Sequence, residues 1–190
     1  SIQYSFAVVF CLPGSLSTYH IADRYTGSWA NGEQNGHGLY IEAATGNTYE
    51  GGWKAGVRHG TGTLTSGGQD FIYEGDWCEG VRTGEGRCVI NGQDTYNGQW
   101  RDNKFHGQGQ FSDADGNVYD GEWAVGLRHG MGKQQVCAGE EGEECEEYNG
   151  EWYQGHRHGI GTCAYPNKSV YSGNWVWVGV GAMFLASFAL

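Results

Sequence analysis

The feature that most constrains the fold is a Tyr-x-Gly-x-Trp unit that recurs seven times along the chain. The units begin at intervals of 24, 24, 23, 23, 29 and 23 residues. Their bounds are Tyr25–Trp29, Tyr49–Trp53, Tyr73–Trp77, Tyr96–Trp100, Tyr119–Trp123, Tyr148–Trp152 and Tyr171–Trp175. In the first six units a Gly-x-Gly pair follows at a fixed distance, as at Gly60 and Gly62. Such a period indicates a repeat protein in which each unit is one supersecondary element.

Each unit predicts a β-hairpin. Tyr, Gly and Trp stand at positions i, i+2 and i+4, which places them on one face of a strand. In the second unit we expect a turn over residues 56–60 and a second strand from Gly62 onward. One hairpin cannot bury its own aromatic row, but stacked hairpins bury it continuously, and glycines opposite the rings leave room for them. Between hairpins the sequence offers two-residue turns at Thr45-Gly46, Gly67-Gly68, Asn91-Gly92 and Asp115-Gly116.

Composition agrees with an all-β chain and argues against several other classes. Glycine supplies 35 of the 190 residues, and each glycine costs about 1 kcal/mol relative to alanine inside a helix. The 8 Trp and 12 Tyr are not typical of a disordered chain. A formal net charge of −11 argues against nucleic acid or bare anionic lipid as the main partner. The 6 cysteines show no CxxC spacing, so a zinc site has little support.

The pattern resembles the MORN (membrane occupation and recognition nexus) repeat, whose consensus is close to Tyr-x-Gly-x-Trp-x-x-Gly-x-x-His-Gly-x-Gly. Residues 25–175 hold six complete copies and one half copy, in which Asn35 and Thr83 replace the motif's His and Asn103 replaces its mid-turn glycine. The resemblance implies an all-β, elongated array of antiparallel hairpins with a shallow groove. We expect its structural core to consist of Tyr49, Trp53, Tyr73, Trp77, Tyr96, Trp100, Tyr119, Trp123, Tyr148 and Trp152.

The two ends lie outside the repeat, which predicts three regions: an apolar amino-terminal segment or cap over 1–24, the repeats over 25–175, and an apolar segment over 176–190. As a short helix the last region would be about 23 Å long, against a bilayer core of about 30 Å. It is either a membrane segment or a buried cap on the last hairpin. The candidate membrane residues are Trp175, Trp177, Met183, Phe184, Leu185, Phe188 and Leu190.

The fifth repeat carries an acidic insertion with six Glu between residues 140 and 147. It is interpreted either as a docking site for a basic partner or divalent cation, or as a solvated loop. Cys137 and Cys145 flank it closely enough to form a disulfide in an oxidising compartment.

The sequence offers no convincing catalytic, cofactor or metal site. His59, His106, His129 and His158 recur at one repeat position, which favours a structural role in which each His hydrogen-bonds its own turn. A weak calcium-like segment lies over 113–117 but lacks the glycine that such a loop needs, and the sequon over 167–169 matters only on an extracytoplasmic face. We therefore expect no catalytic, cofactor-binding or metal-binding residues.

Three functions are compatible with the sequence. The first is a non-catalytic adaptor that binds proteins through the repeats and is attached by its apolar end to a membrane or to a multi-subunit membrane complex, as an accessory subunit. This order of repeats and anchor is similar to that of the junctophilins. The second is a soluble cytoskeletal or axonemal scaffold of the cytoplasm, and the third is a regulatory module separated from an enzyme. The apolar stretch over 176–190 favours the first.

Overall fold

The computed structural model describes residues 3–4, 22–137 and 145–177, and all regular structure in this part of the chain is β-strand. Two compact units divide the chain, Ser1–His106 and Gly107–Leu190. The first contains β1 (Gln3–Tyr4), β2 (Arg24–Ala30), β3 (Glu33–Ile41), β4 (Thr48–Lys54), β5 (Val57–Thr65), β6 (Phe71–Cys78), β7 (Val81–Ile90) and β8 (Asp94–Arg101). The second contains β10 (Val118–Ala124), β11 (Leu127–Val136), β12 (Glu146–Tyr153), β13 (His156–Ala164) and β14 (Val170–Trp175).

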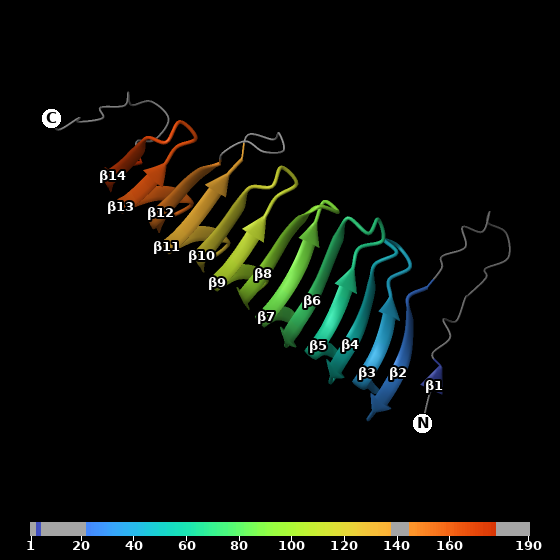
Figure 1. Ribbon diagram of the computed structural model, residues 1–190. Helices are drawn as coiled ribbons and strands as arrows, with labels where there is room; N and C mark the ends of the chain where they lie inside the picture. Colours follow the sequence, from blue (N-terminus) through green and yellow to red (C-terminus); the bar gives the residue numbers. More distant parts are fainter. Residues whose placement is uncertain (1–2, 5–21, 138–144, 178–190) are drawn as a thin grey trace, which may run out of the picture. The chain divides into compact units, whose positions relative to one another are not determined.

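Strand β9 (Lys104–Ser112) contains the boundary between the two units. The strands are hydrogen-bonded in chain order in one open sheet, and within each unit they follow one another as antiparallel neighbours (Figure 1). The predicted all-β architecture of successive hairpins is therefore confirmed. The expected carboxyl-terminal helix is not found: Val176 and Trp177 are not helical, and residues 178–190 lie outside the described part.

The turn inside each hairpin is tighter than the sequence suggested. In the second hairpin only Ala55 and Gly56 separate β4 from β5, and both have positive φ, at 48° and 78°. Positive φ at both central residues defines the type I′ turn, whose twist matches the twist of paired strands. The expected turn over 56–60 was wrong, because Gly60 already belongs to β5 and lies beside a β-bulge that shifts the register after Gly51.

The loops between hairpins are longer than two residues. Three residues join β7 to β8, and Asn91 and Gly92 there have positive φ. Five residues join β9 to β10, and the carboxylate of Asp113 accepts hydrogen bonds from the backbone N–H groups of Asp115 and Asn117. The calcium-like segment is thus an ordinary loop held by its own first side chain. The two kinds of connection lie at opposite ends of the strands.

The core is a ladder of Tyr and Trp rings on one face of the sheet. In the first unit Tyr49 meets Trp53 of its own strand and Trp77 of the next hairpin, with ring centroids 5.2 Å apart in both pairs and interplanar angles of 85° and 81°. In the second unit Tyr119 meets Trp123 and Trp152 in the same way, at 5.1 and 5.2 Å. Edge-to-face contacts of this kind stabilise aromatic pairs beyond the area they bury.

Each ring also carries its polar group to a backbone acceptor. The Tyr hydroxyl donates to the carbonyl three residues later, as from Tyr49 to Gly52 at 3.0 Å. The Trp Nε1 donates to a glycine carbonyl of the preceding hairpin, as from Trp77 to Gly62 at 3.1 Å. Trp29 is different: its Nε1 is buried without a hydrogen-bond partner. Strand β1 precedes the strand of Trp29 in the sheet and pairs Gln3 with Gly27. Between inner strands the corresponding glycine pairs with another glycine, as Gly51 does with Gly38.

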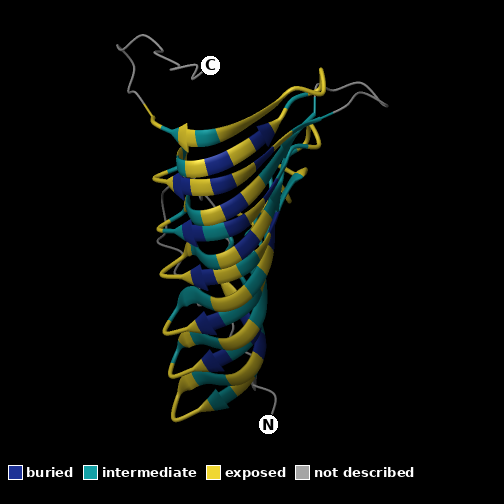
Figure 2. Cartoon of the chain, turned by 60° about the vertical axis from the view of Figure 1, so that its left-hand side comes forward, coloured by how far each residue is buried: buried dark blue, intermediate teal, exposed yellow. Residues whose placement is uncertain are grey.

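Glycine pairs opposite one another make room for this ladder. Gly75 of β6 faces Gly86 of β7, and a Cβ on Gly75 would lie 2.5 Å from the Cα of Gly86 and 2.6 Å from the hydroxyl oxygen of Tyr73. A Cβ on Gly86 would lie 2.6 Å from the same hydroxyl. Because these neighbours are backbone and a packed ring, neither can give way. Figure 2 shows the result as bands of buried residues across the strands, with exposed turns at their ends.

We expect Gly75→Ala to lower the free energy of unfolding by about 1–3 kcal/mol, the usual cost of overpacking a core. The matched control is Gly68→Ala, where the nearest atom to the new methyl group is the Asp70 carboxylate oxygen at 3.6 Å. That change should stay within about 0.5 kcal/mol. Urea titrations followed by tryptophan fluorescence measure both, and equal losses at the two positions would contradict the packing argument.

Candidate functional site

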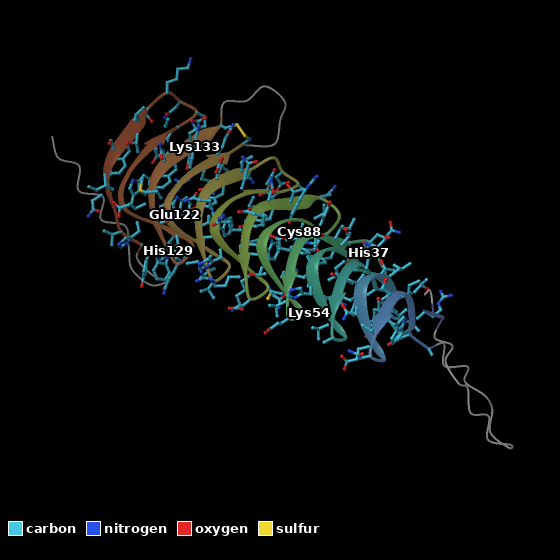
Figure 3. The ribbon with its side chains drawn as sticks, turned by 90° about the horizontal axis from the view of Figure 1, so that it is seen from below. His37, Lys54, Cys88, Glu122, His129 and Lys133 are labelled. Atoms are coloured by element: carbon cyan, nitrogen blue, oxygen red, sulfur yellow. A yellow bond between two sulfur atoms is a disulfide. The ribbon has the colours of Figure 1, made fainter. Side chains whose placement is uncertain are left out.

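The ten predicted core residues all lie in the buried ring ladder. Their side chains are between 0% and 8% exposed, and Tyr25, Cys88 and Cys163 join them (Figure 3 labels Cys88). Burial raises the pKa of the Cys88 thiol to about 11, so at neutral pH it is a packed apolar group. The ring ladder is therefore a structural core, and a ligand would meet the side chains that lie over the rings.

A row of arginines lies over the ring ladder, and sequence reasoning missed its role. Four hairpins carry Arg nine residues after their Tyr, directly across from their Trp: these are Arg58, Arg82, Arg128 and Arg157. Each guanidinium carbon lies over the Tyr ring of its own hairpin and over the Trp ring of the next one. For Arg58 the distances to the Tyr49 and Trp77 ring centroids are 4.9 and 5.2 Å. For Arg128 the distances to Tyr119 and Trp152 are 5.6 and 4.7 Å.

This cation–π arrangement places positive charge on a half-buried surface. Guanidinium groups bind aromatic faces favourably, by about 0.5–1 kcal/mol at exposed sites and more when desolvated. Burial lowers the pKa of Arg82 and Arg128 below the usual value of an arginine, which still leaves both groups charged at neutral pH. The signal in the sequence was the register: a residue opposite each Trp must share the ring face, and in four of six hairpins that residue is Arg.

The two remaining hairpins carry other residues at this position. Phe105 stacks on Tyr96 with ring centroids 3.7 Å apart and planes 9° apart. It therefore adds an aromatic ring to the ring face where the other hairpins add a positive charge. Gln34 occupies the position in the first hairpin. The arginine row is therefore interrupted, with one pair in each compact unit.

The four guanidinium groups differ in the ion pairs and side-chain hydrogen bonds that they form within the protein. Arg157 forms an ion pair with Glu146 at 2.6 Å and donates to the Gln134 side chain at 2.8 Å. Arg82 donates to the side-chain oxygen of Asn103, the residue that replaces the motif's mid-turn glycine. Within the described residues, Arg58 and Arg128 have no carboxylate partner. These two guanidiniums are the groups best placed to meet an anionic ligand.

The acidic insertion begins and ends at a disulfide. Cys137 and Cys145 are bonded, with an S–S distance of 2.07 Å, and the bond is visible in Figure 3. Residues 138–144 lie outside the described part. Glu146 pairs with Arg157, and Glu147 pairs with Lys133 at 3.1 Å. At least these two carboxylates of the acidic stretch are thus neutralised by the sheet itself.

The recurring histidines do not hold their turns as expected. Nδ1 of His59 is buried and has no hydrogen-bond partner. The backbone carbonyls of His106, His129 and His158 instead accept weak hydrogen bonds from Tyr hydroxyls at 3.4–3.5 Å. At the histidine position the recurring contact is therefore made by the backbone carbonyl and not by the imidazole ring. Among the described residues, no group of His, Cys, Asp and Glu is arranged to hold a metal ion.

The structure describes two of the candidate membrane residues. Trp175 is half-buried at the end of the ring ladder, while Trp177 is exposed and stacks on His156 with centroids 4.2 Å apart. Met183, Phe184, Leu185, Phe188 and Leu190 lie outside the described part. Among the residues that are described, there is no helix with the length and apolar character needed to cross a bilayer.

The fold and its surface define an all-β repeat protein built from similar hairpins around a Tyr–Gly–Trp core. The family model of the MORN repeat matches residues 25–41, 49–70, 73–95, 96–118, 119–135 and 148–170. These six segments cover more than half of the chain, and the protein therefore belongs to the MORN-repeat family. Repeats of this family are typically protein- or membrane-binding modules and generally act as structural or adaptor elements. No curated protein matches the chain.

The buried phenols predict a loss of stability in alkaline solution. Burial raises the pKa of Tyr49 to about 12 and raises the pKa values of Tyr73, Tyr96 and Tyr119 further. The unfolded chain therefore loses these protons first, so the contribution of the phenols to stability is complete below pH about 10 and falls as the pH rises through 12. The thiol of Cys88, raised from 9.0 to about 11, starts the decline near pH 9.

Urea titrations at pH values from about 8 to about 11 measure this effect. We expect the midpoint to fall from pH 9 upward, and the double variant Cys88→Ala, Cys163→Ala should delay the onset to about pH 10, because burial raises the pKa of both thiols. A midpoint that stays constant to pH 11 would show that the phenols are as accessible to deprotonation in the folded state as in the unfolded chain.

Proposed function

We propose that this protein is a non-catalytic adaptor that binds an extended, acidic segment of a partner protein on its ring face. The observation that carries the proposal is the arginine row, which holds guanidinium groups over rings at one repeated register. Arg58 in the first unit and Arg128 in the second have no carboxylate partner among the described residues. The chain as a whole carries a net charge of −11. Cations fixed on one face of an acidic protein select for anionic ligands by orientation as well as by charge.

The aromatic surface around these guanidiniums suits a polypeptide more than a small ion. The Phe105 ring lies between the two pairs of arginines in the sequence and offers apolar contact at the same register. Tyr, Trp and Arg are the residues most enriched at protein–protein hot spots. Within either unit, an extended partner segment with carboxylates near the guanidiniums would bury the charged and the aromatic groups together.

We propose that residues 176–190 attach the adaptor to a membrane or a membrane complex, where it serves as an accessory subunit. Support comes from the sequence: no charged residue follows Lys168, and the run ends in Met183, Phe184, Leu185, Phe188 and Leu190. Trp177 is exposed and has the amphipathic ring typical of membrane interfaces. A soluble cytoskeletal scaffold is the alternative that the experiments below would favour if attachment fails.

Selection of short random peptides on the full chain tests the adaptor proposal. We expect the enriched peptides to carry Asp or Glu, to bind more weakly in high salt, and to lose about tenfold in affinity, or about 1.4 kcal/mol, on Arg128→Met. Arg101→Met is the matched control, because Arg101 is an exposed arginine beside a turn and the change in net charge is identical. Neutral or basic peptides that bind both variants equally would contradict the proposal.

Flotation with vesicles of neutral phosphatidylcholine tests the attachment. We expect the full chain to float with the vesicles and the double variant Phe184→Asp, Phe188→Asp to remain behind, because each buried carboxylate costs about 2.5–3.5 kcal/mol at the centre of a bilayer. The control, Val125→Asp with Ile160→Asp, adds the same charge at two exposed apolar positions of the sheet. If the full chain does not float, the attachment is wrong and the scaffold alternative takes its place.

A further inference from the structure

Three side chains of the first compact unit lie on the ring face at the same position of successive hairpins. Arg58 lies on β5, Arg82 on β7 and Phe105 on β9, with β6 and β8 between them (Figure 1). Each lies over the Tyr ring of its own hairpin, at distances to the ring centroid of 4.9, 5.5 and 3.7 Å. Along the sheet the row therefore presents a cation, a second cation and an aromatic ring.

The hairpins that carry this row are in register with one another. Gly62 of β5 pairs with Gly75 of β6, and Gly75 pairs with Gly86 of β7. The step from one hairpin to the next is therefore two strand spacings straight across the sheet, or about 9.6 Å at about 4.8 Å per strand. A ligand that meets equivalent side chains of successive hairpins must present its own groups on one side and at the same interval.

Among the regular backbone conformations, the polyproline II helix fits this interval best. It has three residues per turn and rises about 3.1 Å per residue, so residues i, i+3 and i+6 lie on one side at intervals of about 9.3 Å. In a β-strand, residues i and i+3 point to opposite faces. In an α-helix, residues i and i+7 lie on one side but are about 10.5 Å apart. The mismatch per hairpin is thus about 0.3 Å for polyproline II and about 0.9 Å for the α-helix.

The twist of the sheet favours the same conformation. Neighbouring strands rotate by about 20–25° relative to one another, so a bound segment must turn as it crosses successive hairpins. A polyproline II helix has no internal hydrogen bonds and can adjust its turn without breaking any, whereas an α-helix is held by its i to i−4 bonds. Aromatic surfaces are also the surfaces on which proteins bind polyproline II segments.

Both arginines of the row keep N–H donors for a carboxylate. An arginine has five such donors in a planar fork. Asn103 takes two of those of Arg82, since Nε donates to its side-chain oxygen at 3.2 Å and Nη2 to its backbone carbonyl at 3.3 Å. Arg58 has no carboxylate partner among the described residues. Because both guanidiniums lie half-buried over rings, a carboxylate there would form charge-assisted hydrogen bonds in a medium less polar than water.

We propose that the first unit binds a proline-rich segment of a partner protein in the polyproline II conformation, with Asp or Glu at positions i and i+3 and an apolar residue at i+6. The two carboxylates meet Arg58 and Arg82, and the apolar side chain meets Phe105. The residues between them point away from the ring face, where proline is accepted because this conformation needs no backbone hydrogen bonds. The proposal rests on the proposed function and adds the conformation and the spacing of the bound segment.

Fluorescence anisotropy of short labelled peptides with the full chain tests the spacing. The spaced peptide is Glu-Pro-Pro-Glu-Pro-Pro-Leu, prepared in this order and in the reverse order, because the row does not define a chain direction. The control peptide, Glu-Glu-Pro-Pro-Pro-Pro-Leu, has the same composition and net charge. We expect one of the two spaced peptides to bind at least about tenfold more tightly than the control, because only its carboxylates reach both arginines.

Substitutions on the sheet connect this preference to the row. Arg82→Met keeps an aliphatic side chain over the rings and removes the second cation, so the spaced and control peptides should then differ by less than about twofold. Arg101→Met, at an exposed arginine of the same unit, makes the same change in charge and should keep the tenfold difference. Phe105→Arg extends the cations by one hairpin and should favour glutamate in place of leucine in the spaced peptide, whereas the unmodified chain should favour leucine. Circular dichroism verifies that each variant is folded.

The outcomes separate a failure of this proposal from a failure of the proposed function. Equal affinity of the spaced and control peptides, or tighter binding of a helical peptide with glutamate at every seventh residue, overturns the proposal and leaves the acidic adaptor in place. A preference that survives in Arg82→Met also overturns it, because the ligand then lies elsewhere. If neither these peptides nor any acidic peptide from the random selection binds, both fail. A tenfold preference that is lost in Arg82→Met and kept in Arg101→Met supports the proposal.

Discussion

The structure depends on one contact, a tyrosine ring that fills the space of two absent side chains. The hydroxyl oxygen of Tyr73 lies 2.6 Å from where a Cβ would stand on either Gly75 or Gly86. The ring can therefore lie against the backbone of two paired strands and reach its own carbonyl acceptor at Asp76, 2.9 Å away. Without glycine the ring would have to stand upright, and neither this hydrogen bond nor the contact with the next Trp would form.

That contact also determines how the hairpins join. With its Tyr flat, each hairpin exposes a ring edge that only a Trp from the following hairpin covers, and the Trp then donates to a glycine carbonyl of the hairpin before it. Trp100 shows both links, through its ring contact with Tyr73 at 4.9 Å and its hydrogen bond to Gly86 at 3.0 Å. Stability is therefore a nearest-neighbour property, as in other repeat proteins.

Much of the fold and of the buried core could be predicted because the same residue pattern recurs in every repeat. One Tyr-x-Gly-x-Trp unit would be weak evidence for a strand, but seven units in one register identify the ring face, and with it the ten core residues. The turns were harder to predict. Ala55 and Gln154 adopt positive φ at 48° and 49°, a conformation that their residue types do not favour. The pairing of the two strands that flank the turn determines its length and conformation, and the conformational preferences of the turn residues alone do not predict them.

The arginine row was also difficult to predict from the sequence, because its position depends on strand pairing. Arg58 and His59 are adjacent in sequence, and from the sequence the recurring His is the stronger functional candidate because imidazole titrates near neutral pH. Alternation along the strand places Arg58 on the ring face, directly opposite Trp53, and its neighbour His59 on the other side of the strand. That pairing follows from the two-residue turn at Ala55 and Gly56, whereas the expected turn over residues 56–60 left Arg58 inside the turn and so gave it no strand face.

Charge and packing have separate positions in this molecule, which is why an acidic chain can present cations. Carboxylates beside the bulges serve the backbone: Glu122 accepts from the N–H of Met131 at 2.9 Å, and Glu151 accepts from that of Ile160 at 3.1 Å (Figure 3 labels Glu122). The ring face needs no carboxylate to hold Arg128, because two ring faces do so. A cation fixed by π systems keeps its hydrogen-bond donors, whereas one fixed by an ion pair has used them. The hairpin core thus supplies the scaffold and leaves the guanidinium donors of Arg128 available to the proposed partner segment.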